Sequence, residues 1–493
     1  MPLEKQYIKL IFGIKLKQYR QRLNLSLQQL SDACGVSVSY LNEIEKGKKY
    51  PKTDKIISLA QALKVHPMDL KSEMLDKTLA PITQLMHSGI LSELPLDLFG
   101  LEASRLLDLL SNAPSKLNAF IGTLLEVSRN YDVRVETFYF SVLRSYQEIH
   151  ENYFDEIEKK AEEFIQSTCA IRQKHLSAHH FEDYLVDQYN YEIVWDDFDG
   201  HEALNDMRTL TVIKRRRKHL ILNRKLSSRQ RAFYLAKEVG YNYLAFKERN
   251  YTMPWVKIDS FDQVLNDFLA SYFASAVLIN KPDFTKDLKA FFQNDEWNQN
   301  ILIDTMREYN ATPEMVLQRM TNLLPASFGL KELFFFKFNH KPGTNYYSLS
   351  KELHLSRQHQ PRGTVLQEHF CRRWEFIQML NELSQKPDEI IGGAHIAQYL
   401  DTKEEFLLLS LAKPFSPTLG INNSLSLGIR LNDKARDTIR FLQDSSIKTK
   451  LVHDTCERCP AANCNKRVAP ATVFDGKKKE AQRIELLRDY GLS

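Results

Sequence analysis

Residues 26–51, SLQQLSDACGVSVSYLNEIEKGKKYP, hold helix start and stop signals at close spacing, and these signals limit what the segment can fold into. Ser26 and Ser37 can each cap a helix, because a serine hydroxyl accepts a hydrogen bond from a free N–H group of the first turn. Gly35 allows a tight turn between the two helices, and Gly47 ends the second one. The pattern predicts a helix-turn-helix.

The residues around this motif, 10–70, predict five helices with a compact apolar core. The core positions are Leu16, Leu23, Leu30, Val36, Leu41, Ile44, Ile56, Leu59 and Leu63. The segment resembles the Cro/repressor helix-turn-helix family, because the turn, both caps and the E-x-G ending fall in register. Leu27 departs from that family, which commonly has a glutamine there that touches the DNA backbone. Gln28 or Gln29 would have to take that role.

The second helix is expected to enter the major groove of a double-stranded DNA operator. Its exposed face would carry Val38, Ser39, Asn42 and Glu43. Asparagine can pair with adenine, glutamate with cytosine N4, and valine with a thymine methyl group. The side chains better suited to phosphates are Arg20, Tyr40, Lys46, Lys48 and Lys49.

The charge distribution favours the same partner. Residues 1–70 hold twelve Lys and Arg against six acidic residues, a net charge of +6, whereas the whole chain is only +5. A basic module on a neutral body suggests a polyanion partner. The alternative is a small helical protein-interaction module with a solvated basic face.

The length of 493 residues is too great for one core and predicts three or four domains. We expect a multidomain chain, mainly α with α+β parts. The expected divisions are a helix-turn-helix domain at 1–72, a helical connector at 73–150, a middle α+β domain at 151–345 and a C-terminal cysteine domain at 346–493.

Two general expectations follow from the same sequence. Specific DNA binding by so small a module usually requires a homodimer that reads two half-sites, and residues 76–150 are either its interface or structural core. The apolar stretches are too short to span a membrane and the N-terminus lacks a signal-peptide core, so we expect a cytoplasmic protein with no membrane partner.

The segment FYLAKEVGY, residues 233–241, differs from a zinc-peptidase helix at two positions. With histidine in place of Lys237 and Tyr241 it would read H-E-x-x-H. Glu238 is present, but a lysine opposes Zn²⁺ binding and no metal-bound water remains for the glutamate to deprotonate. The pattern predicts a peptidase scaffold without catalysis.

The surrounding order of strand, hairpin and two helices resembles the IrrE-like peptidase domain, so the domain at 151–345 is expected to be a degenerate IrrE-like domain. In that family a second helix, with an F-A-x-x-L-L-x-P pattern, supplies a further acidic ligand. Here Phe273-Ala274, Leu278 and Pro282 keep only a shifted version, and the nearest acid is Asp267.

The helix pair is expected to enclose a cleft with aromatic walls and cations at its rim. Its expected lining is Arg231, Phe233, Tyr234, Lys237, Tyr241, Tyr272 and Phe273. Such a cleft would suit a ligand that is part apolar and part phosphate. The alternative is that aromatic residues at helical spacing are core and that KRRRK (214–218) is a solvated hairpin tip.

Three cysteines, Cys456, Cys459 and Cys464, lie close enough in sequence to converge on one metal centre. In a reducing compartment such a cluster indicates metal or redox chemistry. Cys371, in HFCRRW, is the best fourth ligand. Zn²⁺ and an iron–sulfur cluster both accept four thiolates, and the spacing does not separate them.

Taken together, the chain resembles the short-chain fatty-acyl transcriptional regulators of bacteria. The segments that carry this resemblance are HENYFDEIEKKAEEF, FLASYFASAVL, LQRMTNLLPASFGLKELFFFKFN, FCRRW and CERCPAANCNKRVAP. The resemblance implies CoA or a short-chain acyl-CoA as effector and a [4Fe–4S] cluster on Cys371, Cys456, Cys459 and Cys464. Many members carry another cysteine where this chain has Ile429.

Three hypotheses follow. The first is a DNA-binding regulator, not an enzyme, with a CoA-type effector that changes how two helix-turn-helix modules are spaced. The second is a regulatory metallopeptidase of the IrrE-like type, which needs metal at Glu238. The third is a redox-sensing regulator without a CoA effector.

Overall fold

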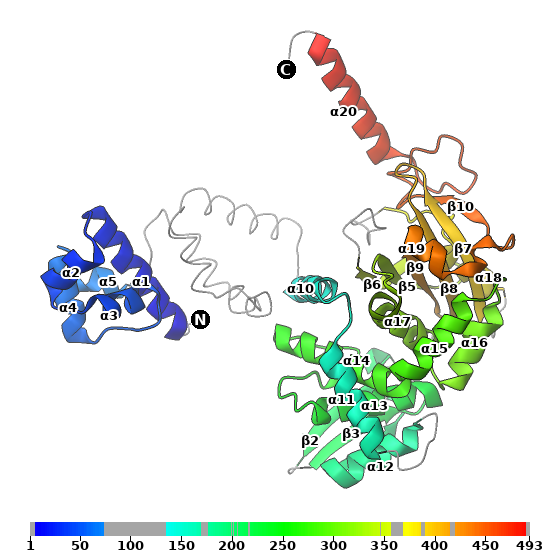
Figure 1. Cartoon of the computed structure of the whole chain (residues 1–493), viewed down its shortest axis with the longest axis horizontal. Helices are drawn as coiled ribbons and strands as arrows, with labels where there is room; N and C mark the ends of the chain where they lie inside the picture. The colour runs from blue at the N-terminus through cyan, green and yellow to red at the C-terminus, as the bar shows by residue number, and fades with distance from the viewer. Residues whose placement is uncertain are drawn as a thin grey trace. The chain divides into compact units, whose positions relative to one another are not determined.

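A computed structural model gives the fold. The residues it describes are 5–72, 135–168, 176–198, 200, 202–204, 206–214, 217–345, 347–355, 368–385, 390–414 and 420–489. The chain divides into two compact units, residues 1–140 and 141–493 (Figure 1). Each unit is considered separately below. Most of the expected connector, 73–134, lies outside the described residues.

The N-terminal unit contains the five predicted helices. They are α1 (Lys5–Arg22), α2 (Leu27–Cys34), α3 (Val38–Glu45), α4 (Thr53–Ala62) and α5 (Pro67–Lys71). Eight of the nine predicted core residues are buried, and Leu23 is exposed instead. Gly13 lets α1 approach α3 closely, since a Cβ there would stand 2.3 Å from the carbonyl oxygen of Ile44.

The second unit begins with helices that pack around a small sheet. Its first helices and strands are α10 (Val135–Ile149), α11 (Asp155–Thr168), α12 (Ala178–Tyr189), β1 (Tyr191–Asp196), β2 (Thr209–Lys214), β3 (Arg217–Asn223), α13 (Ser228–Tyr243), β4 (Thr252–Met253) and α14 (Phe261–Leu278). The strand order is β1-β3-β2-β4, with β1 parallel to β3 and the other pairs antiparallel. This is the strand, hairpin and two-helix order that the sequence predicts for a peptidase-like domain.

The remaining elements build a larger sheet with helices on both faces. They are α15 (Lys281–Phe292), α16 (Gln299–Glu308), α17 (Pro313–Leu323), β5 (Leu333–His340), β6 (Tyr347–His354), α18 (Glu375–Leu383), β7 (Ile391–Tyr399), β8 (Glu405–Pro414), β9 (Asn422–Arg430), α19 (Asp433–Thr438), β10 (Thr449–Val452) and α20 (Thr472–Asp489). Three short turns of other helix types occupy 202–204, 324–328 and 440–443. The strand order is β10-β7-β8-β9-β5-β6.

The sequence predicts a domain boundary at residue 345, but the pairing of the larger sheet crosses it. Strand β5 was expected in the middle domain, but it pairs with β6 and β9 of the larger sheet. One hydrophobic core runs from α13 and α14 through α17 to Leu425 and Leu427 on β9. The peptidase-like part and the cysteine-bearing part therefore share a core and form one unit.

Candidate functional site

The α2–α3 pair has the local geometry of a helix-turn-helix. The Ser26 hydroxyl accepts from the Gln29 amide in a capping box, and Gly35 follows α2 at φ 67°. The Ser37 hydroxyl accepts from the Tyr40 amide and starts α3. Leu41 and Ile44 of α3 are fully buried. The predicted base-reading residues Val38, Ser39, Asn42 and Glu43 are exposed or half-buried on the rest of that helix.

Arg20 and Gln29, two of the residues expected to contact the DNA backbone, have structural roles within the protein. The Arg20 guanidinium forms a two-pronged ion pair with Glu45, at 2.6 and 2.9 Å, and also donates to the carbonyl oxygen of Leu25. The side-chain oxygen of Gln29 accepts a hydrogen bond from the Ser26 amide at 2.8 Å. Arg20 and Gln29 hold the motif together, and the side-chain amide of Gln28 donates to Asp32 at 3.0 Å.

The remaining basic candidates lie at the end of α3. Lys46, Lys48 and Lys49 are exposed. The Lys49 ammonium lies 2.7 Å from Glu43 and 5.7 Å from the centre of the Tyr40 ring. This pairing lowers the pKa of Glu43 through the Lys49 hydrogen bond. Glu43 is thus charged. To pair with a DNA base it would have to break its ion pair with Lys49.

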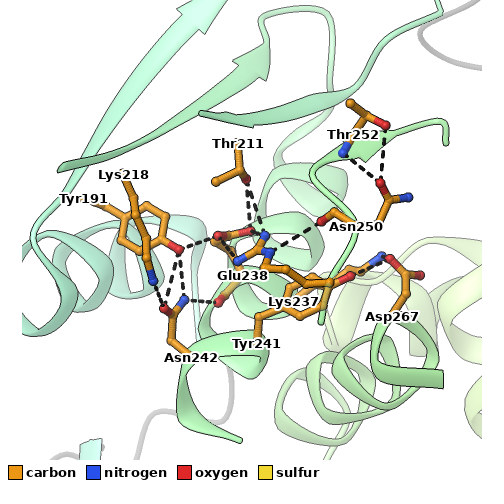
Figure 2. Close-up of polar contacts among 11 residues, drawn as sticks. Tyr191, Thr211, Lys218, Lys237, Glu238, Tyr241, Asn242, Asn250, Thr252 and Asp267 are labelled. Carbon is orange, nitrogen blue, oxygen red and sulfur yellow. Dashed lines mark hydrogen bonds and ion pairs between the residues drawn. The ribbon is translucent and has the colours of Figure 1, made fainter. Parts of the chain in front are cut away.

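The peptidase-like helix α13 carries Glu238 into a buried ion pair. Arg249, from the loop after α13, donates to both carboxylate oxygens at 2.7 and 2.6 Å. The Tyr191 hydroxyl donates to the same carboxylate at 2.5 Å, and the Thr211 hydroxyl lies 3.4 Å away (Figure 2). Burial alone would raise the pKa of Glu238, but Arg249 and Tyr191 hold it below the ordinary value. The glutamate is therefore a charged partner of Arg249 at neutral pH.

The two positions that would hold histidines are linked through Asp267 of α14. The Lys237 ammonium and the Tyr241 hydroxyl both donate to one oxygen of this carboxylate, at 2.7 and 2.6 Å. Lys237 is 7% exposed and Tyr241 3% exposed. The side chains of Lys237, Tyr241 and Asp267 therefore bond to one another at the position where a zinc ion would need them as ligands. Burial and the neighbouring Asp267 raise the pKa of Tyr241 well above its ordinary value, so this hydroxyl stays protonated.

The predicted effector cleft is only partly present. Tyr234, Lys237 and Tyr241 line a small cavity together with Glu238 and Arg249. Both cations named here already have carboxylate partners. The Lys237 ammonium therefore bonds to Asp267 and is not free to bind an anionic ligand.

The other predicted cleft residues point elsewhere. The Tyr272 hydroxyl donates to Glu158 at 2.7 Å, and the Phe273 ring packs against Phe164 in the core. Phe233 is half-buried against Tyr234. The Arg231 guanidinium lies 4.7 Å from the Trp195 ring. These four residues do not line the Glu238 cavity.

The four predicted cysteines come together. Cys371, Cys456, Cys459 and Cys464 line one cavity with basic residues around it; those are Arg372, Arg373, Lys466 and Arg467. Burial, with smaller contributions from Cys456 and Cys459, raises the pKa of the Cys371 thiol to about 11. As placed, no three His, Cys, Asp or Glu side chains of the described ranges stand close enough to hold a single metal ion.

Two arginines shape this cysteine cavity. Arg467 donates to the carbonyl oxygens of Cys456, Cys459 and Ala461 at 2.6, 3.1 and 2.6 Å, which holds the loop in place. Nη1 of Arg372 is buried and has no hydrogen-bond partner among the described residues. The guanidinium stacks on the Tyr347 ring at 4.1 Å. A half-buried cation with one buried, unused donor beside these thiols fits an anionic thiolate centre.

Comparisons with known proteins agree with this geometry. A family model described as a helix-turn-helix matches residues 16–70, and one described as an IrrE N-terminal-like domain matches residues 199–321. Control protein C.BamHI of Bacillus amyloliquefaciens is 36% identical over 64 residues, which are 13% of this chain and 79% of that protein.

Two solved structures are similar at low identity. A Mycobacterium tuberculosis transcriptional regulator aligns over 67% of this chain and 93% of its own, with 17% identity and a TM-score of 0.46. The apo form of the competence regulator ComR from Streptococcus vestibularis aligns over 66% and 88%, with 16% identity and a TM-score of 0.13. Both scores are too low to transfer a property to this chain.

The capped α2–α3 pair and the two domain matches define a DNA-binding transcriptional regulator of the Cro/C1 helix-turn-helix class, joined to a peptidase-like domain. Through its N-terminal residues the chain belongs to the helix-turn-helix family that includes control protein C.BamHI. Helices in the described ranges are all too short or too polar to cross a membrane.

Proposed function

We propose that this regulator is a cytoplasmic homodimer that controls transcription in response to a small effector, CoA or a short-chain acyl-CoA. We propose also that its four C-terminal cysteines hold a [4Fe–4S] cluster. The observation that carries the DNA-binding role is the capped α2–α3 pair, with Asn42 on the half-exposed side of α3 and lysines at its end. The effector proposal is supported by the resemblance of segments along the chain to the fatty-acyl regulators.

The same proposal holds that the peptidase-like domain is not an enzyme. A zinc hydrolase needs three protein ligands and an open position for water. Here the ammonium of Lys237 bonds to Asp267, and the guanidinium of Arg249 covers the carboxylate of Glu238. Lys237 and Arg249 therefore place two positive charges among the residues that would have to bind a Zn²⁺ ion. The ion pairs leave Glu238 without a free carboxylate to act as a base.

The cluster proposal is supported by the donor set at the cysteine cavity. Cys371, Cys456, Cys459 and Cys464 would be the ligands, and Arg372 would offset the negative charge of the thiolates. A cluster held by four thiolates carries redox chemistry whose potential depends on burial and nearby hydrogen bonds. Arg467 keeps the loop that bears three of the cysteines in one conformation.

Purification under nitrogen should give brown protein with about four iron and four sulfide per chain, as a [4Fe–4S] cluster requires. Cys459→Ser should lose most of the iron, because it removes a buried ligand. Cys34→Ser changes a cysteine of α2 and should keep all of it. Colourless wild-type protein with one zinc would select a structural zinc site instead.

DNA capture tests the function as a whole. The full chain, mixed with sheared DNA of its source organism, should retain a discrete set of fragments at physiological salt. Its affinity for them should change at least five-fold with a short-chain acyl-CoA, which is about 1 kcal/mol of coupling. Retention that responds to air but not to acyl-CoA would favour the redox-sensing regulator. Retention of no fragment would contradict the proposal.

A further inference from the structure

The fourth cysteine of the thiol cavity comes from a part of the chain far from the other three. Cys371 lies before α18, whereas Cys456, Cys459 and Cys464 follow β10. A short loop can bring three thiols together, but the fourth thiol depends on contacts between two distant segments. We call residues 368–371 the Cys371 segment and residues 453–459 the Cys456 segment.

Few backbone hydrogen bonds join these two segments. The Cys371 amide donates to the carbonyl oxygen of Asp454 at 3.1 Å, and the Cys456 amide donates to that of His369 at 2.8 Å. Both bonds belong to one isolated antiparallel bridge at Phe370, which does not extend into a strand. Because even a complete two-stranded pair is only marginally stable in water, this bridge alone holds the cysteines weakly.

A two-pronged ion pair reinforces the bridge. The Arg458 guanidinium donates to both carboxylate oxygens of Glu368, at 2.7 and 2.6 Å. The Thr455 hydroxyl donates to the same carboxylate at 2.7 Å. The Glu368 side chain is only 11% exposed and Thr455 is buried. Paired donors on a largely buried carboxylate fix both distance and orientation, so this contact ties the two segments together.

A second contact joins the segments with the roles exchanged. The Glu457 carboxylate accepts from the His369 backbone amide at 2.9 Å, and its other oxygen lies 2.7 Å from Nδ1 of the His369 ring. The Glu457 side chain is also largely buried. Each segment therefore supplies one carboxylate and one donor side chain to the other.

These contacts are specific for one register of the two segments. Glu368 and Glu457 each lie two residues from the bridge, on facing positions. Facing carboxylates repel each other unless each has a donor of its own. Arg458 and His369 supply those donors in the observed register, which is the one that brings the Cys371 segment to the thiol cavity.

We call four residues the clamp: Glu368, His369, Glu457 and Arg458. We propose that the clamp positions the Cys371 thiol against the other three cysteines. The clamp residues do not line the thiol cavity, so they act through the cysteines and not on a bound metal. The inference rests on the proposed function in treating the four cysteines as one ligand set.

Arg467 has a different task in the same region. It donates to the carbonyl oxygens of Cys456, Cys459 and Ala461, all within the loop that carries three of the thiols. Loss of the clamp should therefore release Cys371 and leave those three thiols in place. The result would be a three-thiolate site instead of a four-thiolate site.

Titration of the metal-free full chain with Co²⁺, under nitrogen, tests the clamp. The intensity of sulfur-to-cobalt absorption reports how many thiolates bind. Glu368→Gln should bind about tenfold or more weakly than wild type, with an intensity lowered towards that of Cys371→Ser. Arg458→Lys keeps the charge and should retain most of the affinity. Glu151→Gln breaks an exposed ion pair with Lys331 and is the matched control, with wild-type binding.

The sign of the effect separates positioning from charge. A Co²⁺ ion with four thiolates is a negatively charged centre, so loss of the Glu368 carboxylate would strengthen binding if charge alone decided it. Positioning by the clamp requires weaker binding. Arg458→Gln breaks the same ion pair from the other segment and should give the same loss of thiolate absorption.

Alkylation of the metal-free chain gives a readout that needs no metal. Cys371 is 5% exposed, and iodoacetamide should modify it slowly in wild type. Glu368→Gln should raise that rate about fivefold or more, because the Cys371 segment opens more often. Cys34 lies in the N-terminal unit and should keep its wild-type rate. Mass spectrometry measures the rate at each cysteine.

The outcomes separate the clamp from the proposed cluster. Wild-type Co²⁺ affinity or a wild-type alkylation rate at Cys371 in Glu368→Gln would overturn the clamp. Absence of thiolate–cobalt absorption in the wild type would overturn it as well. A wild-type chain that binds Co²⁺ through four thiolates but never holds iron would contradict only the cluster.

Discussion

The double substitution Asn42→Ala and Lys46→Ala should lower the affinity for a captured DNA fragment by about 100-fold or more. An asparagine that pairs with adenine contributes about 1–3 kcal/mol, and a dimer loses this contact in both half-sites. Loss of Lys46 removes a phosphate contact in addition. Fluorescence anisotropy with a labelled fragment measures the change.

The substitutions should leave the module folded, because Lys46 is exposed and Asn42 is only half-buried. Circular dichroism checks this. Gln61→Ala, at an exposed position of α4, is the matched control and should bind DNA like wild type. Unchanged affinity in the folded double variant would assign DNA binding to another surface.

The substitution Glu238→Gln should lower the free energy of unfolding of the second unit by about 3–5 kcal/mol. It leaves the guanidinium of Arg249, which is 7% exposed, without its counter-charge. Because Arg249 and Tyr191 hold the pKa of Glu238 below its ordinary value of 4.5, its contribution is present above about pH 4.5 and is lost as the pH falls through the folded pKa. Urea unfolding at pH 7 measures the loss.

A second substitution separates charge burial from simple loss of packing. Arg249→Leu added to Glu238→Gln removes the unpaired cation and should recover part of the stability. Glu163→Gln breaks an exposed ion pair on α11 and should have no measurable effect. If Glu238→Gln were as stable as wild type but had lost a peptidase activity, the charge-paired interpretation would be wrong.

The local features of the N-terminal module were predictable from sequence. Ser26, Gly35 and Ser37 act on residues within one helical turn, so their pattern in the sequence is enough to predict the caps and the turn. Arg20 was assigned to DNA for its charge alone. Its partner, Glu45, lies on another helix, and no spacing in the sequence connects them.

The peptidase-like site was predictable in its residues but not in its partners. Lys237 and Tyr241 stand out because they replace histidines in a known pattern. Arg249 follows Glu238 by eleven residues in a loop, and nothing in its neighbourhood marks it as a partner. Tyr272 and Phe273 were misplaced because α14 is buried around most of its circumference, so apolar spacing does not show which side faces the cavity.

The boundary expected at residue 345 differs from the observed sheet pairing for a related reason. The apolar run of β5 reads equally well as the end of one domain or the start of another. The hydrogen bonds between β5 and β9, some ninety residues later in the chain, place β5 in the larger sheet.

In the peptidase-like domain of this DNA-binding regulator, we propose that ion pairs take the place of a catalytic metal. Anomalous diffraction at the zinc edge, from crystals of the full chain grown with excess Zn²⁺, is the decisive measurement. We expect no zinc peak beside Glu238, with Lys237 bonded to Asp267 and Arg249 to Glu238. A zinc ion bound between Glu238 and Asp267 would contradict the claim.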